Sequence, residues 1–199
     1  MRKIAILASG SGSLAQAIFD AVADKRLNCS IHALICDKPG AAVIDRAQMH
    51  NVPVHLHPMK SDRALWNTEL LQLLQSMNLD LIVSAGFMRI LDQRITSTLP
   101  IINSHPALLP AFPGAHAVRD ALAAGVTRTG TTIHWVDAGV DTGEIIAQEE
   151  LDIRPGESKE SLHERIKIVE RSLIVATIGQ LLSAMENGTS SQRRRSLER

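Results

Sequence analysis

The sequence predicts an α/β protein built on a doubly wound, mostly parallel sheet. One observation is that short apolar runs alternate with amphipathic helical segments through residues 1–100, as they do in right-handed β–α–β units. A second is that a Gly/Ser loop at residues 10–13 separates the first apolar run from the first helical pattern. This order of strand, loop and helix is typical of a Rossmann-like half. The N-terminal half is therefore expected to have that form.

The spacing of apolar residues gives the order of the elements. In the first half it predicts strands over 3–7, 31–36, 52–56 and 80–85, and helices over 14–22, 41–50, 62–77 and 92–98. In the second half it predicts strands from 101 and over 129–136 and 143–151, and helices over 117–124 and 158–186. Together these elements form one domain, 1–188, whose smaller C-terminal half (101–188) ends in a long helix. The arginine-rich tail, 189–199, is expected to be disordered.

Composition indicates a soluble globular protein without a polyanionic partner. Lys plus Arg total 21 and Asp plus Glu total 21, so no net field attracts nucleic acid or an anionic membrane. The apolar run at 4–8 is too short for a signal peptide or a membrane span. Cys29 and Cys36 lack metal-ligand spacing, which fits reduced thiols. We therefore expect a cytoplasmic protein with small-molecule partners and with no metal, nucleic acid or membrane contact.

The stretch 101–114 carries the first candidate catalytic residues. Pro106 disfavours helical backbone at the preceding residue, so the strand should continue to His105. Asn103 and His105 are two residues apart and therefore leave the same face of an extended strand. The amide and the imidazole could act in catalysis, or they could be an ordinary turn cap and a half-buried histidine. Spacing alone does not decide between these interpretations.

The loop 10–13 is a candidate anion site. Its backbone N–H groups lie at a helix N-terminus, where the helix dipole favours a phosphate. Gly10, Gly12 and Ala15 also fit the dinucleotide fingerprint, with Asp37 available to hold a ribose. Three interpretations stay open: a phosphate site, a nicotinamide-dependent oxidoreductase, and a tight turn that binds nothing.

Two further loops complete the candidate site. Residues 85–91 follow a central strand at its carboxyl end, the edge at which open α/β sheets bind ligands. This apolar loop could hold a flat heterocycle, or it could pack in the core. Asp137 and Asp141 lie in a glycine-containing loop; turn chemistry explains both, but a carboxylate near His105 would also orient its imidazole. Because no nucleophile elbow is present, these parts suit group transfer between two bound molecules.

These motifs, in this order, resemble those of the folate-dependent phosphoribosylglycinamide formyltransferases, a family of 10-formyltetrahydrofolate transformylases. The resemblance covers roughly residues 3–188. It rests on Ser9-Gly-Ser-Gly-Ser13, Ala85-Gly-Phe-Met-Arg-Ile-Leu91, Asn103-Ser-His-Pro-Ala-Leu-Leu-Pro110, and His134-Trp-Val136 through Asp141-Thr-Gly143. It implies transfer of a formyl group from 10-formyltetrahydrofolate to the amine of N1-(5-phosphoribosyl)glycinamide in purine biosynthesis, without a metal, by a monomer or homodimer.

The resemblance also implies a role for each part of the site. Asn103, His105 and Asp141 would be the catalytic set. The substrate's phosphate and ribose would meet Gly10, Ser11, Gly12, Ser13, Leu14 and Glu170. The folate would meet Arg63, Met88, Arg89, Ile90, Leu91, Val136, Asp137, Ala138, Gly139 and Val140. Residues 1–100 would thus form the phosphate-binding half and 101–188 the catalytic and folate-binding half. The family usually has asparagine where this chain has Leu14, which removes one side-chain contact to the phosphate.

Two other activities are compatible with these motifs. A formyltetrahydrofolate deformylase-like hydrolase would transfer the formyl group to water, but such enzymes resemble this chain only in their catalytic domain. They carry an additional N-terminal domain, whereas the first strand is expected here at residue 3, so we expect an amine acceptor. The second alternative is an NAD(P)-dependent oxidoreductase, which would use the fingerprint at Gly10, Gly12 and Ala15 with Asp37 at the ribose.

Overall fold

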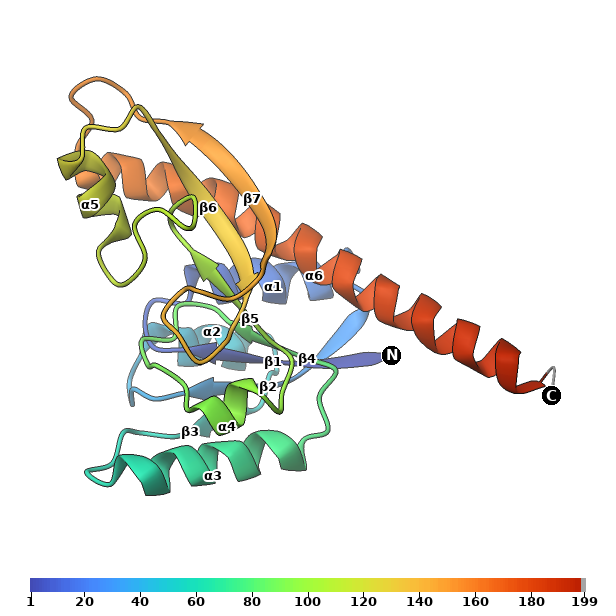
Figure 1. Ribbon diagram of the computed structural model, residues 1–199. Helices are drawn as coiled ribbons and strands as arrows, with labels where there is room; N and C mark the ends of the chain where they lie inside the picture. Colours follow the sequence, from blue (N-terminus) through green and yellow to red (C-terminus); the bar gives the residue numbers. More distant parts are fainter. Residues whose placement is uncertain (198–199) are drawn as a thin grey trace.

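The computed structural model describes the backbone of residues 1–197 and the side chains of residues 1–186 (Figure 1). The described chain contains one seven-stranded sheet with the order β3-β2-β1-β4-β5-β6-β7. Its strands are β1 (Arg2–Ala8), β2 (Cys29–Cys36), β3 (Val54–Leu56), β4 (Leu81–Ser84), β5 (Ile101–His105), β6 (Arg128–Trp135) and β7 (Ile145–Asp152). The first five strands in the order are parallel, while β6 runs antiparallel to β5 and β7 antiparallel to β6. The predicted α/β fold with a mostly parallel sheet is confirmed.

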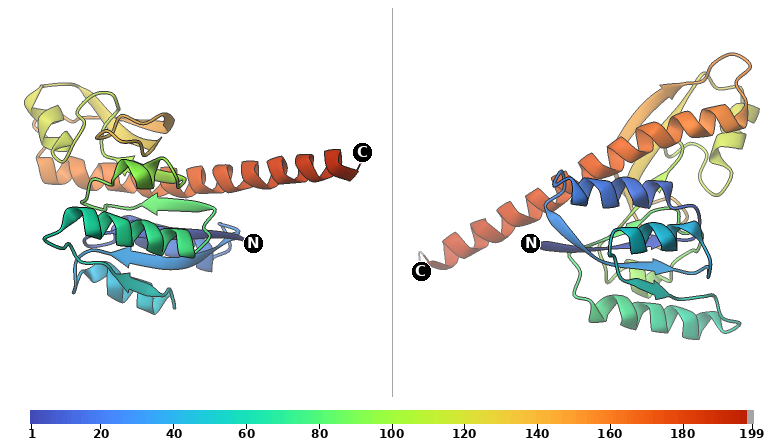
Figure 2. Two further views of the ribbon diagram at one scale, coloured as in Figure 1. Left: turned by 60° about the horizontal axis from the view of Figure 1, so that its bottom comes forward. Right: turned by 180° about the vertical axis from the view of Figure 1, so that it is seen from behind.

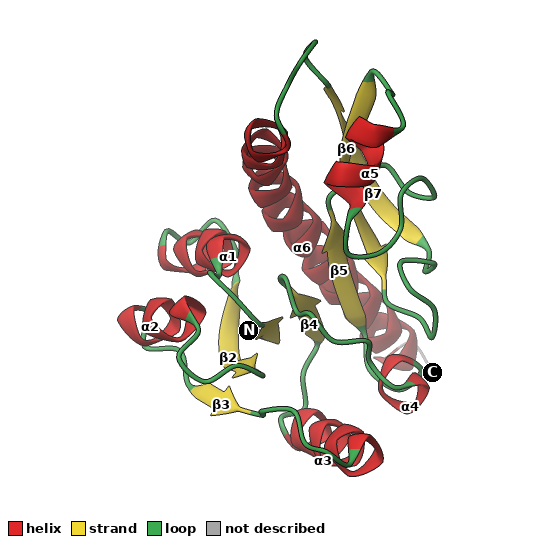
Figure 3. Ribbon diagram, turned by 90° about the vertical axis from the view of Figure 1, so that its left-hand side faces the viewer, coloured by secondary structure: helices red, strands yellow, loops and turns green. Residues whose placement is uncertain are grey.

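Helices cover both faces of this sheet (Figure 3). They are α1 (Ser13–Ala23), α2 (Ala42–Met49), α3 (Arg63–Ser76), α4 (Gln93–Thr96), α5 (Ala117–Ala123) and α6 (Lys159–Leu197). The faces follow from the two-residue period of a strand. Ile4 and Ile6 of β1 pack in one core with α1, α2 and α6, whereas Ala5 and Leu7 pack in a second core with α3 and α4. Alternate residues of each central strand therefore belong to different cores.

The long helix α6 lies along the α1 side of the sheet and then projects past it (Figures 1 and 2). Its segment Lys159–Glu186 is long and apolar enough for a membrane span by length and composition alone. Ile174 and Ile178, however, are buried in the core against the sheet. The helix continues past the predicted end at 186 as far as Leu197. Residues 198–199 lie outside the described residues, and the disorder expected of 189–199 stays a prediction. Once a helix is nucleated by packing, further residues add at little free-energy cost.

The carboxyl ends of three parallel strands meet at one edge of the sheet. In the register, Leu7 lies beside Ser84, and Ser84 beside Asn103. The segments that follow β1, β4 and β5 therefore leave the sheet side by side. The strand order reverses between β1 and β4, and such a reversal opens the crevice in which α/β proteins bind ligands.

Apolar spacing alone would favour Leu65 on the inner face of α3. In the structure, however, the Leu65 side chain is 47% exposed and that of Trp66 is fully buried. Trp66 stacks on Phe87 of the loop after β4 with ring centroids 6.5 Å apart. The larger aromatic side chain buries more apolar area, and the helix is rotated accordingly.

Candidate active site

Asp141 connects the two candidate catalytic residues of β5. Its Oδ2 lies 3.2 Å from Nδ1 of His105, and its Oδ1 lies 3.5 Å from Nδ2 of Asn103. Asn103 and His105 leave the same face of β5, as the two-residue spacing predicts. His105 is 3% exposed. The structure therefore brings together all three residues of the predicted catalytic set.

The loop around Asp141 holds its carboxylate in place. The N–H of Gly114 donates to Oδ2 over 2.8 Å, and Asp141 itself has a left-handed backbone with φ of 54°, a conformation that Asp tolerates better than most residues. Burial opposes ionisation of this carboxyl. Hydrogen bonds from His134 and from the Gly114 N–H, together with the charge of His105, outweigh burial and lower the pKa of Asp141. The group is therefore a carboxylate at neutral pH.

His105 has an oxygen atom facing each of its ring nitrogens. Nδ1 faces Asp141, and Nε2 lies 2.8 Å from the carbonyl oxygen of Phe112. A carbonyl oxygen only accepts, so Nε2 carries a proton and donates to Phe112. When Nδ1 is protonated as well, the imidazolium donates to both oxygens. The ring can therefore hold a proton at Nδ1 and exchange it with the carboxylate.

His134 is a member of this site that the sequence reasoning did not assign. It pairs with Asn103 across β5 and β6; its Nε2 lies 3.3 Å from Asn103 Nδ2 and 3.5 Å from Asp141 Oδ1. Its Nδ1 donates to the carbonyl of Trp135 over 2.8 Å. A sequence signal did exist, because the buried strand β6 places the polar residues Thr132 and His134 two apart, on one face.

The loop 10–13, the candidate phosphate site, leads directly into α1. Gly12 precedes the first helical residue with φ of 73°, and a Cβ there would lie 2.5 Å from Cγ2 of Val43. Glycine is required on both counts. The first N–H groups of α1 point out of the helix end, where they can bind an anion. Leu14 is 6% exposed within the core, so only its backbone is available to a phosphate.

Asp37 is closed to a ribose. Its side chain is fully buried, and its Oδ2 accepts a hydrogen bond from Arg89 Nε over 2.5 Å. The acidic residue of a dinucleotide site must instead face the ligand. This geometry removes the sequence argument for an NAD(P)-dependent oxidoreductase.

Glu170 lies on the α6 side of the sheet and faces Ser104 of β5. The Ser104 hydroxyl donates to Oε1 of Glu170 over 2.7 Å. Burial raises the pKa of Glu170, while the Ser104 hydrogen bond and the charges of Lys167 and Arg171 act in the opposite direction. Gly12 directly precedes α1, and Glu170 lies on α6. These two helices lie together on one face of the sheet (Figure 3).

The loop after β4 has both buried and exposed side chains. Met88 and Ile90 are 64% and 63% exposed, whereas Leu91 is 7% exposed in the core. The exposed side chains of this loop are therefore those of Met88 and Ile90, and the folate contact expected of residues 88–91 stays a prediction. Arg63, expected at the folate tail, donates to the carbonyl of Ile90 and lies 4.6 Å above the ring of Trp66.

The loop after β6 contains both Asp141 and the other predicted folate residues, 136–140. Val136 is half-buried against the α3-side core. The remaining positions are exposed: Asp137, Ala138, Gly139 and Val140. Asp137 accepts hydrogen bonds from the Gly139 N–H and the Thr142 hydroxyl, which is ordinary turn chemistry. Asp137 therefore shapes this loop.

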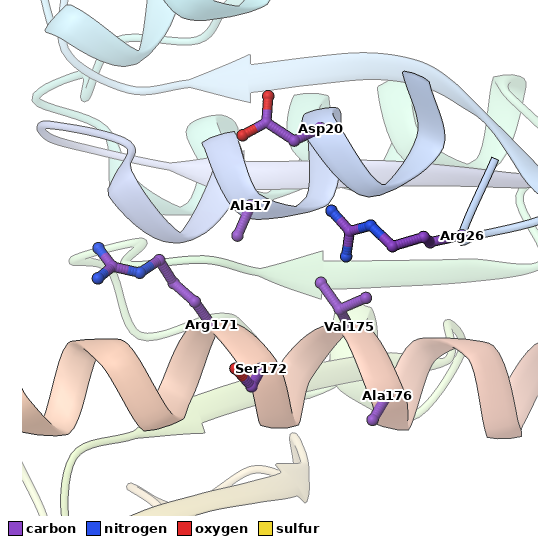
Figure 4. A pocket seen from close by; sticks show the side chains of 7 residues that line it. All are labelled: Ala17, Asp20, Arg26, Arg171, Ser172, Val175 and Ala176. Carbon is purple, nitrogen blue, oxygen red and sulfur yellow. The ribbon is translucent and has the colours of Figure 1, made fainter. Parts of the chain in front are cut away.

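A separate surface hollow of about 410 Å³ lies between α1 and α6. Figure 4 shows the guanidinium groups of Arg26 and Arg171 at its two ends, with Ala17 of α1 on one side and Ser172, Val175 and Ala176 of α6 on the other. None of the predicted site residues lines it. The hollow is therefore distinct from the site around Asp141.

Comparison with known proteins places these features in a family. A family described as formyl transferase matches residues 2–178. A phosphoribosylglycinamide formyltransferase of Mycobacterium tuberculosis is 42% identical over 184 residues, which cover 90% of this chain and 84% of that protein. The Bacillus subtilis enzyme of the same name is 38% identical over 192 residues, with 94% and 98% covered. The crystal structure of phosphoribosylglycinamide formyltransferase from Bacillus halodurans aligns with a TM-score of 0.88 at 41% identity, covering 94% of this chain and 98% of that one.

Proposed function

Since this chain belongs to the formyl transferase family, we propose that it transfers a formyl group from 10-formyltetrahydrofolate to N1-(5-phosphoribosyl)glycinamide through Asn103, His105 and Asp141. The resemblance seen in the four sequence segments is confirmed by relatives of that name. The observation that carries the catalytic assignment is the position of Asp141. Its carboxylate lies within 3.5 Å of polar atoms on Asn103, His105 and His134.

The reaction requires attack of the glycinamide amine on the formyl carbon. The new C–N bond converts the formyl oxygen into an oxyanion, and the bond from carbon to N10 of the folate then breaks. The Asn103 amide and a protonated His105 can donate hydrogen bonds to the oxyanion; loss of one such donor typically lowers the rate by ~10²–10³. At present the Asn103 amide donates only over a long 3.5 Å to Asp141 Oδ1, so it can exchange that bond for a shorter one to the oxyanion.

Proton transfer accounts for the carboxylate and the histidine. The attacking amine must lose a proton, and N10 must gain one as it departs. Asp141, ionised at neutral pH, can accept the amine proton directly or through water. His105 can deliver a proton from its ring, and the 3.2 Å contact between the two groups allows them to exchange it. General acid and base catalysis of this kind contributes ~10²–10⁴ in rate.

The substrates are small molecules, as in the rest of the family. We propose that the substrate phosphate binds the N-terminus of α1 near Gly12, and that its ribose hydroxyls meet Glu170. The pterin would lie between the loops 88–91 and 136–140. We further propose a cytoplasmic enzyme, monomeric or homodimeric, that needs no metal.

Absorbance measurements test this proposal. The protein is mixed with 10-formyltetrahydrofolate, and loss of the formyl-folate is followed with and without glycinamide ribonucleotide. Loss that depends on the amine supports formyl transfer. Loss that is independent of the amine would support deformylation and contradict the proposal, as would the absence of any loss.

A further inference from the structure

The loop after β4 turns alternate side chains in opposite directions. Phe87 and Leu91 are 8% and 7% exposed and pack in the α3-side core, whereas Met88 and Ile90 are more than 60% exposed. This is the alternation of extended backbone. One set of side chains therefore attaches the loop to the protein, and the other set is free to contact a ligand.

Three hydrogen bonds to polar groups hold the exposed part of this loop. The Ser9 hydroxyl accepts from the backbone N–H of Met88 over 2.9 Å, and the guanidinium of Arg63 donates to the carbonyl of Ile90. Between them, Arg89 Nε donates to Oδ2 of Asp37 over 2.5 Å. The three partners come from different elements: the segment after β1, the start of α3 and the segment after β2. The loop is thus positioned from three directions.

Of these three contacts, the ion pair between Asp37 and Arg89 is the one whose partner, Asp37, is a fully buried carboxylate. The Asp37 side chain is fully buried, its Oδ1 has no hydrogen-bond partner among the described residues, and its ion pair is with Arg89. A buried carboxylate is strongly unfavourable without a charged partner. Asp37 therefore commits Arg89 to one position, although the Arg89 side chain remains 30% exposed.

We propose that Asp37 is a positioning residue for binding of the formyl donor. Asp37 would act by holding Arg89, and through Arg89 the loop 88–90. This inference rests on the proposed function, in which the pterin contacts that loop. A loop already held in its binding conformation loses little conformational entropy when ligand binds. Release of Arg89 should therefore weaken donor binding, while chemistry at Asn103, His105 and Asp141 continues once the donor saturates the enzyme.

Asp37→Asn is the first test, because it removes the charge and keeps the shape. We expect the KM for 10-formyltetrahydrofolate to rise about tenfold, while kcat and the KM for glycinamide ribonucleotide stay within about twofold. Glu157→Gln is the matched control. The Glu157 side chain is 2% exposed and pairs with Arg165 at 2.7 Å near the start of α6. That variant should also lose some thermal stability, but its donor KM should be unchanged.

A double-mutant cycle with Arg89→Gln separates positioning from general destabilisation. If Asp37 acts through Arg89, then Asp37→Asn should change the donor KM by less than about twofold in the Arg89→Gln background. The double variant also removes both charges, so it contains no unpaired buried charge and should fold. Equal and additive effects of the two substitutions would contradict the proposal.

Direct binding distinguishes failure of this inference from failure of the proposed function. Titration with a non-transferable 5,10-dideaza analogue of tetrahydrofolate, followed by tryptophan fluorescence, reports donor binding without turnover. Trp66 stacks on Phe87 of the loop after β4, so its fluorescence is expected to report binding at that loop. Weaker binding by Asp37→Asn supports the inference even if turnover is absent. If Asp37→Asn is active and its donor KM and Kd are unchanged, the inference is wrong. It is also wrong if the native protein binds no folate.

Discussion

Oδ2 of Asp141 lies 3.2 Å from Nδ1 of His105, although the two residues are far apart in the chain. The same carboxylate reaches His134 and Asn103 on two adjacent strands. Both histidines are almost fully buried, so these contacts are little screened by solvent. This carboxylate and its three polar neighbours are the centre of the proposed chemistry.

Removal of either partner in the Asp141–His105 contact should abolish most turnover. We expect His105→Ala and Asp141→Ala to lower kcat by ~10²–10⁴, because each removes a group that transfers a proton. Neither side chain is needed to hold the ground state of the substrates, so both KM values should change little. The exposed His55 provides the control variant His55→Ala. Near-normal kcat in either active-site variant would rule out the assignment.

His134 should act through Asp141 rather than on the substrate. His134 donates to Asp141 and helps to lower the pKa of that carboxyl, so His134→Ala should raise that pKa. The acidic limb of the profile of kcat/KM against pH should then move to higher pH, and kcat should fall about tenfold. A variant with lower kcat but an unshifted acidic limb would indicate a purely structural role for His134.

Glu170→Gln should stabilise the protein and weaken substrate binding. Because the pKa of Glu170 is raised, the folded state holds this proton more tightly than the unfolded chain does. The stability from that proton is complete below the ordinary glutamate pKa and is lost as pH rises through the folded pKa. The ionised group therefore destabilises the fold at neutral pH. Glutamine is neutral and can still accept from Ser104.

Thermal unfolding at two pH values tests this prediction. The Tm of Glu170→Gln should exceed that of the native protein by a few degrees at neutral pH, and the difference should disappear at about pH 4. The KM for glycinamide ribonucleotide should rise through loss of the ribose contact. Glu160→Gln, on the exposed side of the first turn of α6, is expected to leave Tm unchanged. A lower Tm for Glu170→Gln at neutral pH would contradict the sign of this argument.

Gly12 and Gly10 should differ sharply in their tolerance of a methyl group. A Cβ at Gly12 would contact Val43, including its backbone Cα at 2.9 Å, in a left-handed conformation. We expect Gly12→Ala to lower the free energy of unfolding by about 2–4 kcal/mol. A Cβ at Gly10 has nothing within 4 Å, so Gly10→Ala should unfold at nearly the same denaturant concentration as the native protein. Equal destabilisation by the two substitutions would show that the Val43 contact is unimportant.

Local sequence patterns determined most of the secondary structure and the content of the site. Apolar periodicity and the positions of Gly and Pro reflect interactions within a few residues, so the order of strands and helices follows from them. The shared face of Asn103 and His105 follows from the two-residue period of β5. The four motifs, taken in order, were also sufficient to identify the family.

Contacts between distant segments were decided only by the tertiary structure. Strand pairing sets His134 opposite Asn103, and the course of the loop after β6 brings Asp141 to both. Asp37 matched a ribose-binding pattern in the sequence, but in the fold it is buried against Arg89, 52 residues away. Likewise, packing rather than helical spacing placed Trp66 inside and Leu65 outside. Local patterns cannot determine these choices, because each depends on which distant side chain fills the adjacent space or balances the charge.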